Sequence, residues 1–245
     1  MLDERALKRG VTAAVRHFWR TRTGQSEKQR QAGQSDQGSR GAVTGGKQMD
    51  GFVKLATSII ESAGMSSKCI HSTTSVELPG FFRPEKKWDL VVVDNNTLVA
   101  AIEFKSQVGP SFGNNFNNRA EEAIGTAQDI WTAYREGAFP LSSRPWLGYL
   151  MMLEDCERST SPVSVRRPNF PTFPEFEGAS YAERYRLLMT KLVRERLYDS
   201  ACFLMSSVIK GARGISAEPA SELAVAQFAA SLSARITTHL ASLAG

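Results

Sequence analysis

Several features that define whole classes of protein are scarce or missing in this sequence. Its 245 residues include three cysteines, Cys69, Cys156 and Cys202, which lie far apart and form no CxxC pair, so neither a disulfide framework nor a zinc site is expected. No stretch reaches the roughly 18 uninterrupted apolar residues of a membrane helix, and the N-terminus lacks the apolar run of a signal peptide. We therefore expect a cytoplasmic protein that does not enter a membrane.

The sequence also gives no sign of histidine-based catalysis or of internal repeats. The three histidines, His17, His71 and His239, are dispersed and have no neighbour that would help them in catalysis. No repeat and only one linker-like stretch are visible, so the length predicts a single domain, residues 1–245, with a substantial core. The net charge of +5 permits a polyanionic partner without requiring one.

The most informative stretch, residues 88–105, contains two apolar, β-branched runs joined by an Asp-Asn-Asn turn, which predicts a β-hairpin. Asp89 opens the first run. Glu103 and Lys105 lie two apart in the second run, so they point to one face of the strand. A three-residue loop or a bulge would place Asp89 opposite Glu103, whereas a regular two-residue loop would send Glu103 to the other face. We predict the longer loop or a bulge.

This D…E-x-K pattern indicates a metal-dependent hydrolytic centre. Two carboxylates about 5 Å apart at their Cβ atoms repel one another, and a divalent cation would compensate that repulsion. Ligation by oxygen alone, with open positions for water and phosphate, suits Mg²⁺, and Lys105 would orient or help deprotonate the attacking water. The alternative is a surface hairpin with scattered charges, which the pattern alone does not exclude.

Basic and amide side chains flank the hairpin. Upstream, three cations are suited to contact phosphates, although they would also serve to solubilise a loop. Downstream, the loop at residues 106–119 carries four asparagines and an arginine, the types that make bidentate contacts to adenine and guanine edges. The competing use of asparagine is in turns and caps, and Asn118 with Glu121 resembles a capping box. The predicted DNA-binding residues are Arg83, Lys86, Lys87, Asn114, Asn115, Asn117, Asn118 and Arg119.

Helical patterns precede the hairpin. Residues 3–20 form an amphipathic pattern with a basic exterior, which suits either solvent or DNA. Residues 22–48 are rich in Gly, Gln and Ser and predict a flexible segment. A second helix follows Asp50 and ends near Gly64. Asp50 and Glu61 on that helix are possible auxiliary acids for the metal, although capping explains Asp50 and exposure explains Glu61 equally well or better.

Further elements are expected after residue 119. The pattern predicts a helix at 119–136, a central strand at 146–153, a long irregular excursion at 155–178, a basic helix at 180–198 that opens with a Ser-x-x-Glu capping box, and a strand at 201–208. A last helix is expected to begin at Pro219. Its apolar stripe fits either the core or a dimer surface.

The longest motif, GPSFGNNFNNRAEEAIGTA at residues 109–127, resembles the XhoI family of Type II restriction endonucleases. Further matching segments follow in order along the chain at residues 49–52, 78–80, 83–84, 88–89, 146–148, 154–156 and 178–181. The resemblance implies an α/β fold, a PD-(D/E)xK nuclease core with a central mixed β-sheet flanked by helices. It also implies a homodimer that cuts palindromic double-stranded DNA at CTCGAG and leaves 5′ overhangs.

Carried over by position, the resemblance implies Asp89 and Glu103 as ligands of Mg²⁺, the Phe104 carbonyl as a further ligand, and Lys105 as the residue that assists the water. Trp88 stands where the motif has a proline, which touches no catalytic group. Two other functions stay open: a DNA-binding or regulatory module that keeps the nuclease fold without cleavage, and a repair nuclease of the same fold that acts on DNA structure. The intact D…E-x-K set argues against the first.

Overall fold

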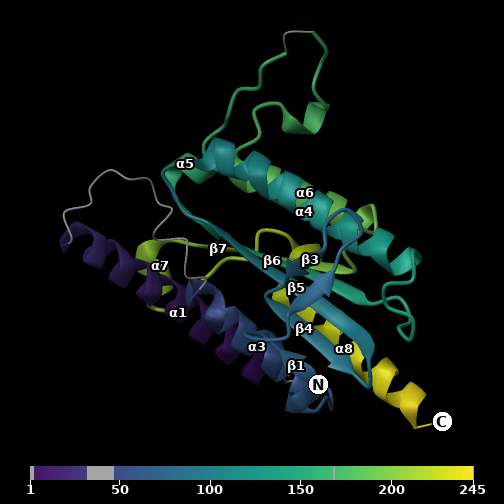
Figure 1. The fold of residues 1–245 in the computed structure, drawn as a ribbon. Coiled ribbons are helices and arrows are strands. Elements are labelled where there is room, and N and C mark those ends of the chain that lie inside the picture. Colours follow the sequence, from purple (N-terminus) through teal and green to yellow (C-terminus); the bar gives the residue numbers. More distant parts are fainter. Residues whose placement is uncertain (1–2, 32–46, 168, 245) are drawn as a thin grey trace.

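A five-stranded mixed β-sheet lies between two layers of helices in the computed structural model of the protein, which describes residues 3–31, 47–167 and 169–244 (Figure 1). The strand order is β1-β4-β5-β6-β7; the first three strands are antiparallel neighbours and the last three run parallel. This architecture confirms the expected α/β fold. The strands are β1 (Ile70–His71), β4 (Leu90–Asp94), β5 (Thr97–Gln107), β6 (Trp146–Glu154) and β7 (Ser200–Ser206).

The two faces of the sheet are covered by different helices. One face carries α1 (Glu4–Gln31), α3 (Asp50–Ser62) and α8 (Val225–Leu243), and the other carries α4 (Phe112–Arg135) and α6 (Tyr181–Arg194). A separate two-stranded sheet joins β2 (Glu77–Pro79) to β3 (Glu85–Lys87) just before the hairpin. The remaining elements are short: η1 (Lys47–Met49), η2 (Ser67–Cys69), α5 (Glu157–Thr160), η3 (Pro174–Phe176), α7 (Val208–Ala212) and η4 (Ser221–Leu223).

Alternation along the central strands divides the core into two clusters. Leu90 and Ile102 pack against the layer of α1, α3 and α8, whereas Val91 and Ala101 pack against the layer of α4 and α6. Because both faces are covered, β6 is apolar almost throughout, and β5 is apolar from Leu98 to Ile102. Glu103 and Lys105 are in phase with Ala101, so they belong to the face that α4 and α6 cover.

The N-terminal helix is longer than predicted. α1 runs to Gln31, so residues 22–31 are helical and the prediction of a flexible segment across 22–48 is wrong there. The sequence after Gly24 is rich in Gln, Glu, Lys and Arg, which have good helix propensity and outweigh the single glycine. Residues 32–46 of that segment lie outside the described residues, and the segment ends in η1.

The helix after the hairpin begins seven residues earlier than predicted. α4 starts at Phe112, so the asparagines expected in a loop lie on its first turns, and the capping box at Asn118 is not formed. Phe112 stacks on Tyr181 with ring centroids 5.7 Å apart, and Phe116 packs edge-on against Tyr185 at 5.1 Å. These contacts at i and i+4 favour the helix despite the poor propensity of asparagine.

The C-terminal half follows the predictions more closely. Ser180 and Glu183 form the expected capping box at the start of α6. α8 begins at Val225, six residues after Pro219, and its apolar stripe packs into the core. The excursion at 155–178 projects beyond α4 and α6 (Figure 1) and leaves Phe170 83% exposed. Among the described residues, no helix is long and apolar enough to cross a membrane.

Candidate active site

The register of the hairpin brings the two predicted carboxylates together. Its loop has two residues, Asn95 and Asn96, both with positive φ (47° and 62°), so the predicted three-residue loop is wrong. The alternative, a bulge, is confirmed. The register shifts between Val92 and Val93, and from there inward Leu90 pairs with Ile102. One position further along, Asp89 falls beside Glu103.

The bulge leaves Val99 as the extra residue, because Val93 pairs with Leu98 and Val92 with Ala100. Arg235 of α8 donates a hydrogen bond from Nε to the Val99 carbonyl over 3.1 Å, and its Nη2 donates to Ser143 Oγ over 3.0 Å. The helix on the far face of the sheet is therefore bonded to the irregularity that sets the register.

The side chains of Asp89, Glu103 and Lys105 come together at the end of the β4–β5 pairing that is farthest from the turn. The Phe104 backbone N–H donates to Asp89 Oδ2 over 2.8 Å, so the Asp89 carboxylate is fixed next to the backbone of the second strand. The Glu103 side chain is only 3% exposed, and its Oε2 lies 2.7 Å from Lys105 Nζ. The prediction that Glu103 and Lys105 share a face is confirmed.

Lys86 is the fourth charged group of this cluster. The sequence predicted that it contacts phosphates, but in the structure it is ion-paired with Glu103. Its Nζ forms an ion pair with Glu103 Oε1 and donates to the Lys87 carbonyl over 3.0 Å, and the side chain is 15% exposed. The ammonium also lies 4.6 Å from the centroid of the Trp88 ring. Burial, with the positive charge of Lys105, lowers the pKa of Lys86 to about 7.

The donor set suits a hard divalent cation. Asp89, Glu103 and the Phe104 carbonyl offer only oxygen, which is what Mg²⁺ prefers. Glu103 Oε1 is buried without a hydrogen-bond partner among the described residues and faces the Lys86 ammonium, so a cation is already favoured at this oxygen. No group of three or more His, Cys, Asp or Glu side chains placed to hold a metal is found in the described part of the chain.

Around the cluster lie Tyr149, Tyr185 and Glu122, which the sequence did not single out, together with Arg119, which it predicted to bind DNA. Tyr149 of β6 is paired in register with Glu103, and burial raises the pKa of its hydroxyl. Glu122 of α4 forms an ion pair with Arg119 and interacts electrostatically with both Lys86 and Lys105. Arg119 Nε and the hydroxyls of Tyr149 and Tyr185 are buried without hydrogen-bond partners. In the sequence, the only sign of this group was the three-residue spacing of Arg119 and Glu122, which places them on one face of a helix.

The predicted DNA-reading asparagines divide into two groups. Asn114, Asn117 and Asn118 are exposed on the first turns of α4. Asn117 and Asn118 follow Asn114 by three and four residues, so the three side chains lie on one face of the helix. Asn115 instead donates from Nδ2 to the Ser111 carbonyl over 2.6 Å. Lys87 is exposed on β3 and lies on the opposite side of that strand from Lys86.

Arg83, also predicted to contact phosphates, is bonded to a buried aspartate. Its Nε lies 2.6 Å from Asp129 Oδ2, and the backbone N–H groups of Phe81 and Phe82 each donate to Asp129 Oδ1 over 2.8 Å. Burial by itself raises the pKa of the Asp129 carboxyl, but these hydrogen bonds outweigh it and hold the pKa below its usual value. Asp129 therefore anchors the loop that leads into β3.

Replacing Asp129 by asparagine is expected to lower the free energy of unfolding at pH 7 by about 1–3 kcal/mol, because one bonded oxygen becomes a donor. Since the folded carboxyl has the lower pKa, this stabilisation is present above the unfolded pKa of about 3.9 and is lost as the pH falls through the folded value. Urea unfolding from pH 7 to pH 3 should show the two proteins converging in acid. The exposed Glu136→Gln change at the C-cap of the same helix is the control. A difference independent of pH would contradict the prediction.

The proposed auxiliary acids lie in the other layer. α3 packs on the face of the sheet opposite to Glu103, and Asp50 and Glu61 are both exposed on it. Asp50 is the first helical residue and not the N-cap, so its predicted capping role is also wrong. The structure does not bring either acid to Asp89 or Glu103, because the sheet separates them.

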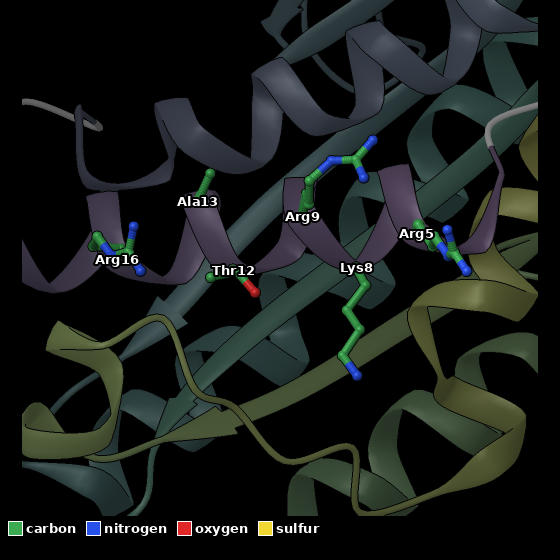
Figure 2. A pocket seen from close by; sticks show the side chains of 6 residues that line it. All are labelled: Arg5, Lys8, Arg9, Thr12, Ala13 and Arg16. Atoms are coloured by element: carbon green, nitrogen blue, oxygen red, sulfur yellow. The ribbon is translucent and has the colours of Figure 1, made fainter.

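A basic hollow of the surface is also separate from the carboxylates. It lies along α1 and is lined by Arg5, Lys8, Arg9, Thr12, Ala13 and Arg16 (Figure 2). Figure 2 shows Arg9 and Lys8 pointing to opposite sides of the helix. α1 belongs to the layer opposite α4, so this basic surface and the Glu103 cluster face different ways (Figure 1).

Comparisons with known proteins find a matching family and similar sequences. Residues 28–218 match the family described as Restriction endonuclease XhoI. The chain is 52% identical over 217 residues to the Type II restriction enzyme BstVI of Geobacillus stearothermophilus, covering 86% of this chain and 97% of that enzyme. It is 46% identical over 194 residues to the Type II restriction enzyme XhoI of Xanthomonas vasicola, covering 78% of this chain and 77% of that enzyme. A third similar protein is the Type II restriction enzyme AbrI of Azospirillum brasilense, 51% identical over 164 residues, covering 66% of this chain and 73% of that enzyme. No solved structure matches the chain.

Proposed function

This chain belongs to the XhoI family of restriction endonucleases, and on that premise we propose that it cuts double-stranded DNA at the palindrome CTCGAG, leaves 5′ overhangs and requires Mg²⁺. Its activity is that of a Type II site-specific deoxyribonuclease. The observation that carries the catalytic assignment is the convergence of Asp89, Glu103 and Lys105 at the bulged hairpin.

Asp89, Glu103 and the Phe104 carbonyl would hold the divalent cation. When bound, the cation would neutralise charge that develops on the phosphate and the leaving oxygen. Lys105 then orients the attacking water from the same strand face as Glu103. The water oxygen forms a bond to phosphorus in line with the bond to O3′, which breaks, so the products carry a 5′-phosphate and a 3′-hydroxyl.

Recognition is assigned to the start of α4. Asn114, Asn117 and Asn118 form an exposed amide face on a helix of the same layer as the catalytic cluster, and asparagine makes bidentate contacts to adenine in the major groove. Asn115 contributes by holding the first turn of the helix. Lys87 and Arg119 are assigned to phosphates. A palindromic site calls for a two-fold symmetric protein, so we propose a homodimer.

Plasmid digestion tests this function. Incubation with Mg²⁺ should give discrete fragments whose sequenced ends map to CTCGAG, and chelation of the metal should stop cleavage. Specific binding without cleavage in any divalent metal would favour the DNA-binding module, and cleavage confined to damaged or branched DNA would favour the repair nuclease. Either result would overturn the proposal.

A further inference from the structure

The Glu103 carboxylate is ion-paired with two ammonium groups, whereas the proposed catalysis requires one. Lys105 lies 2.7 Å from Oε2 and comes from the same strand, as the D…E-x-K pattern requires. Lys86 is ion-paired with the other oxygen, Oε1, and comes from β3, outside the main sheet. Both oxygens of a side chain that is 3% exposed are therefore taken by cations of the protein itself.

The charges of this cluster already balance. With both ammonium groups protonated, Asp89 and Glu103 are balanced by Lys86 and Lys105. Arg119 and Glu122 of α4 are ion-paired with one another and add no net charge. A divalent ion that entered this set unchanged would add two positive charges to a neutral, largely buried cluster, which is unfavourable in a medium of low dielectric constant. Movement of one ammonium group away from Glu103 would remove part of this excess charge and free a carboxylate oxygen for the ion.

Lys86 is the one that can leave. It lies on a three-residue strand whose one partner in the described part of the chain is β2, and its neighbours Glu85 and Lys87 are exposed. Besides Glu103, its ammonium contacts the Lys87 carbonyl and the face of Trp88 within the described part of the chain. Lys105, by contrast, lies within the eleven-residue strand β5 and is paired there with Met151 of β6.

We propose that Lys86 is a built-in counter-cation that occupies the Oε1 side of Glu103 in the metal-free protein and is displaced when a divalent ion binds. This inference rests on the proposed metal site at Asp89 and Glu103. It assigns Lys86 a role in setting the affinity of that site, which differs from the phosphate contact that its sequence position predicts. Lys86 acts as a stand-in for the ion and lowers the cost of an empty site.

Metal affinity without DNA tests the proposal. Titration calorimetry with Mn²⁺ should give a dissociation constant about tenfold lower for Lys86→Met than for the unaltered protein, because no competitor has to be removed. Lys87→Met removes the same charge one residue away, outside the cluster, and should leave the constant within about twofold. Lys86→Gln provides a second variant if methionine impairs folding, and thermal unfolding checks that each protein is folded.

A second readout follows the ammonium itself. Addition of Mn²⁺ or Mg²⁺ should change the near-ultraviolet circular dichroism of Trp88 as the charge leaves its ring, and the change should be absent in Lys86→Met. The Trp88→Phe protein identifies that part of the spectrum. If the unaltered protein binds metal and both Lys86 variants bind it equally or more weakly, the counter-cation role is wrong while the proposed function stands. If none of the proteins binds metal, the metal site of the proposed function fails as well.

Discussion

The Glu103→Gln protein is expected to lose at least about a thousandfold of its cleavage rate while it still binds the cognate duplex. The amide keeps the size of the side chain but supplies no negative charge to a divalent ion and none to Lys86 or Lys105. Cleavage is measured under single turnover on a labelled duplex that contains CTCGAG. Binding is measured by gel shift in Ca²⁺, so that loss of chemistry is separated from loss of recognition.

The same change also affects stability, and the design has to allow for it. Removing a buried anion leaves two lysines without their partner, which costs about 3–5 kcal/mol in comparable cases. The assay is therefore run well below the midpoint of unfolding. Glu61→Gln, in the opposite layer, is the matched control and should retain full activity. Cleavage by Glu103→Gln at the normal rate would remove Glu103 from the active site.

Lys105→Met is expected to reduce the cleavage rate by a factor of about 10²–10⁴, the range found when a group that handles the proton of the attacking water is removed. Methionine keeps most of the aliphatic stem but has no charge. Burial lowers the pKa of Lys105, and the negative charge of Asp89 partly opposes this, so the ammonium gives up a proton more readily than a free lysine would. Single-turnover rates at several pH values measure the loss.

Two comparisons decide what Lys105 does. Lys54→Met removes a lysine from the exposed face of α3 and should leave the rate unchanged. Metal affinity of Lys105→Met, measured without DNA, should not fall, because a cation has been removed from the vicinity of the site. An unchanged cleavage rate would show that another group handles the water, and weakened metal binding would show that Lys105 acts by shaping the carboxylates.

The meeting of Asp89 with Glu103 and Lys105 was predictable because strand geometry is strict. Alternation put Glu103 and Lys105 on one face, and the constant pairing sum of an antiparallel ladder required a bulge or a longer loop to bring Asp89 opposite Glu103. The choice between the two was not in the local pattern. Asn95 and Asn96 both tolerate positive φ, which allows a tight two-residue turn, and the bulge at Val99 is held by Arg235, 136 residues later in the chain.

Of the features that the sequence prediction missed, one is visible in the helical spacing and the others depend on tertiary contacts. The helical start at Phe112 could have been predicted from the stripe of Phe112, Phe116 and Ala123, which has the spacing of a helix face. The inward turn of Lys86 and the bond between Arg83 and Asp129 are different, since each joins segments that only the tertiary fold brings together. A basic run beside a catalytic motif therefore supplies charges to the protein as well as to its ligand.

The hydrogen bond from Arg235 to the bulge makes the hairpin dependent on the C-terminal helix α8. The helix that carries Arg235 shares no surface with the carboxylates, yet it holds the one irregularity without which Glu103 would turn to the wrong side of the sheet. Substitutions within α8 should therefore be able to inactivate the protein. A protein truncated before α8 should lose its cleavage activity although every proposed ligand of the ion is still present.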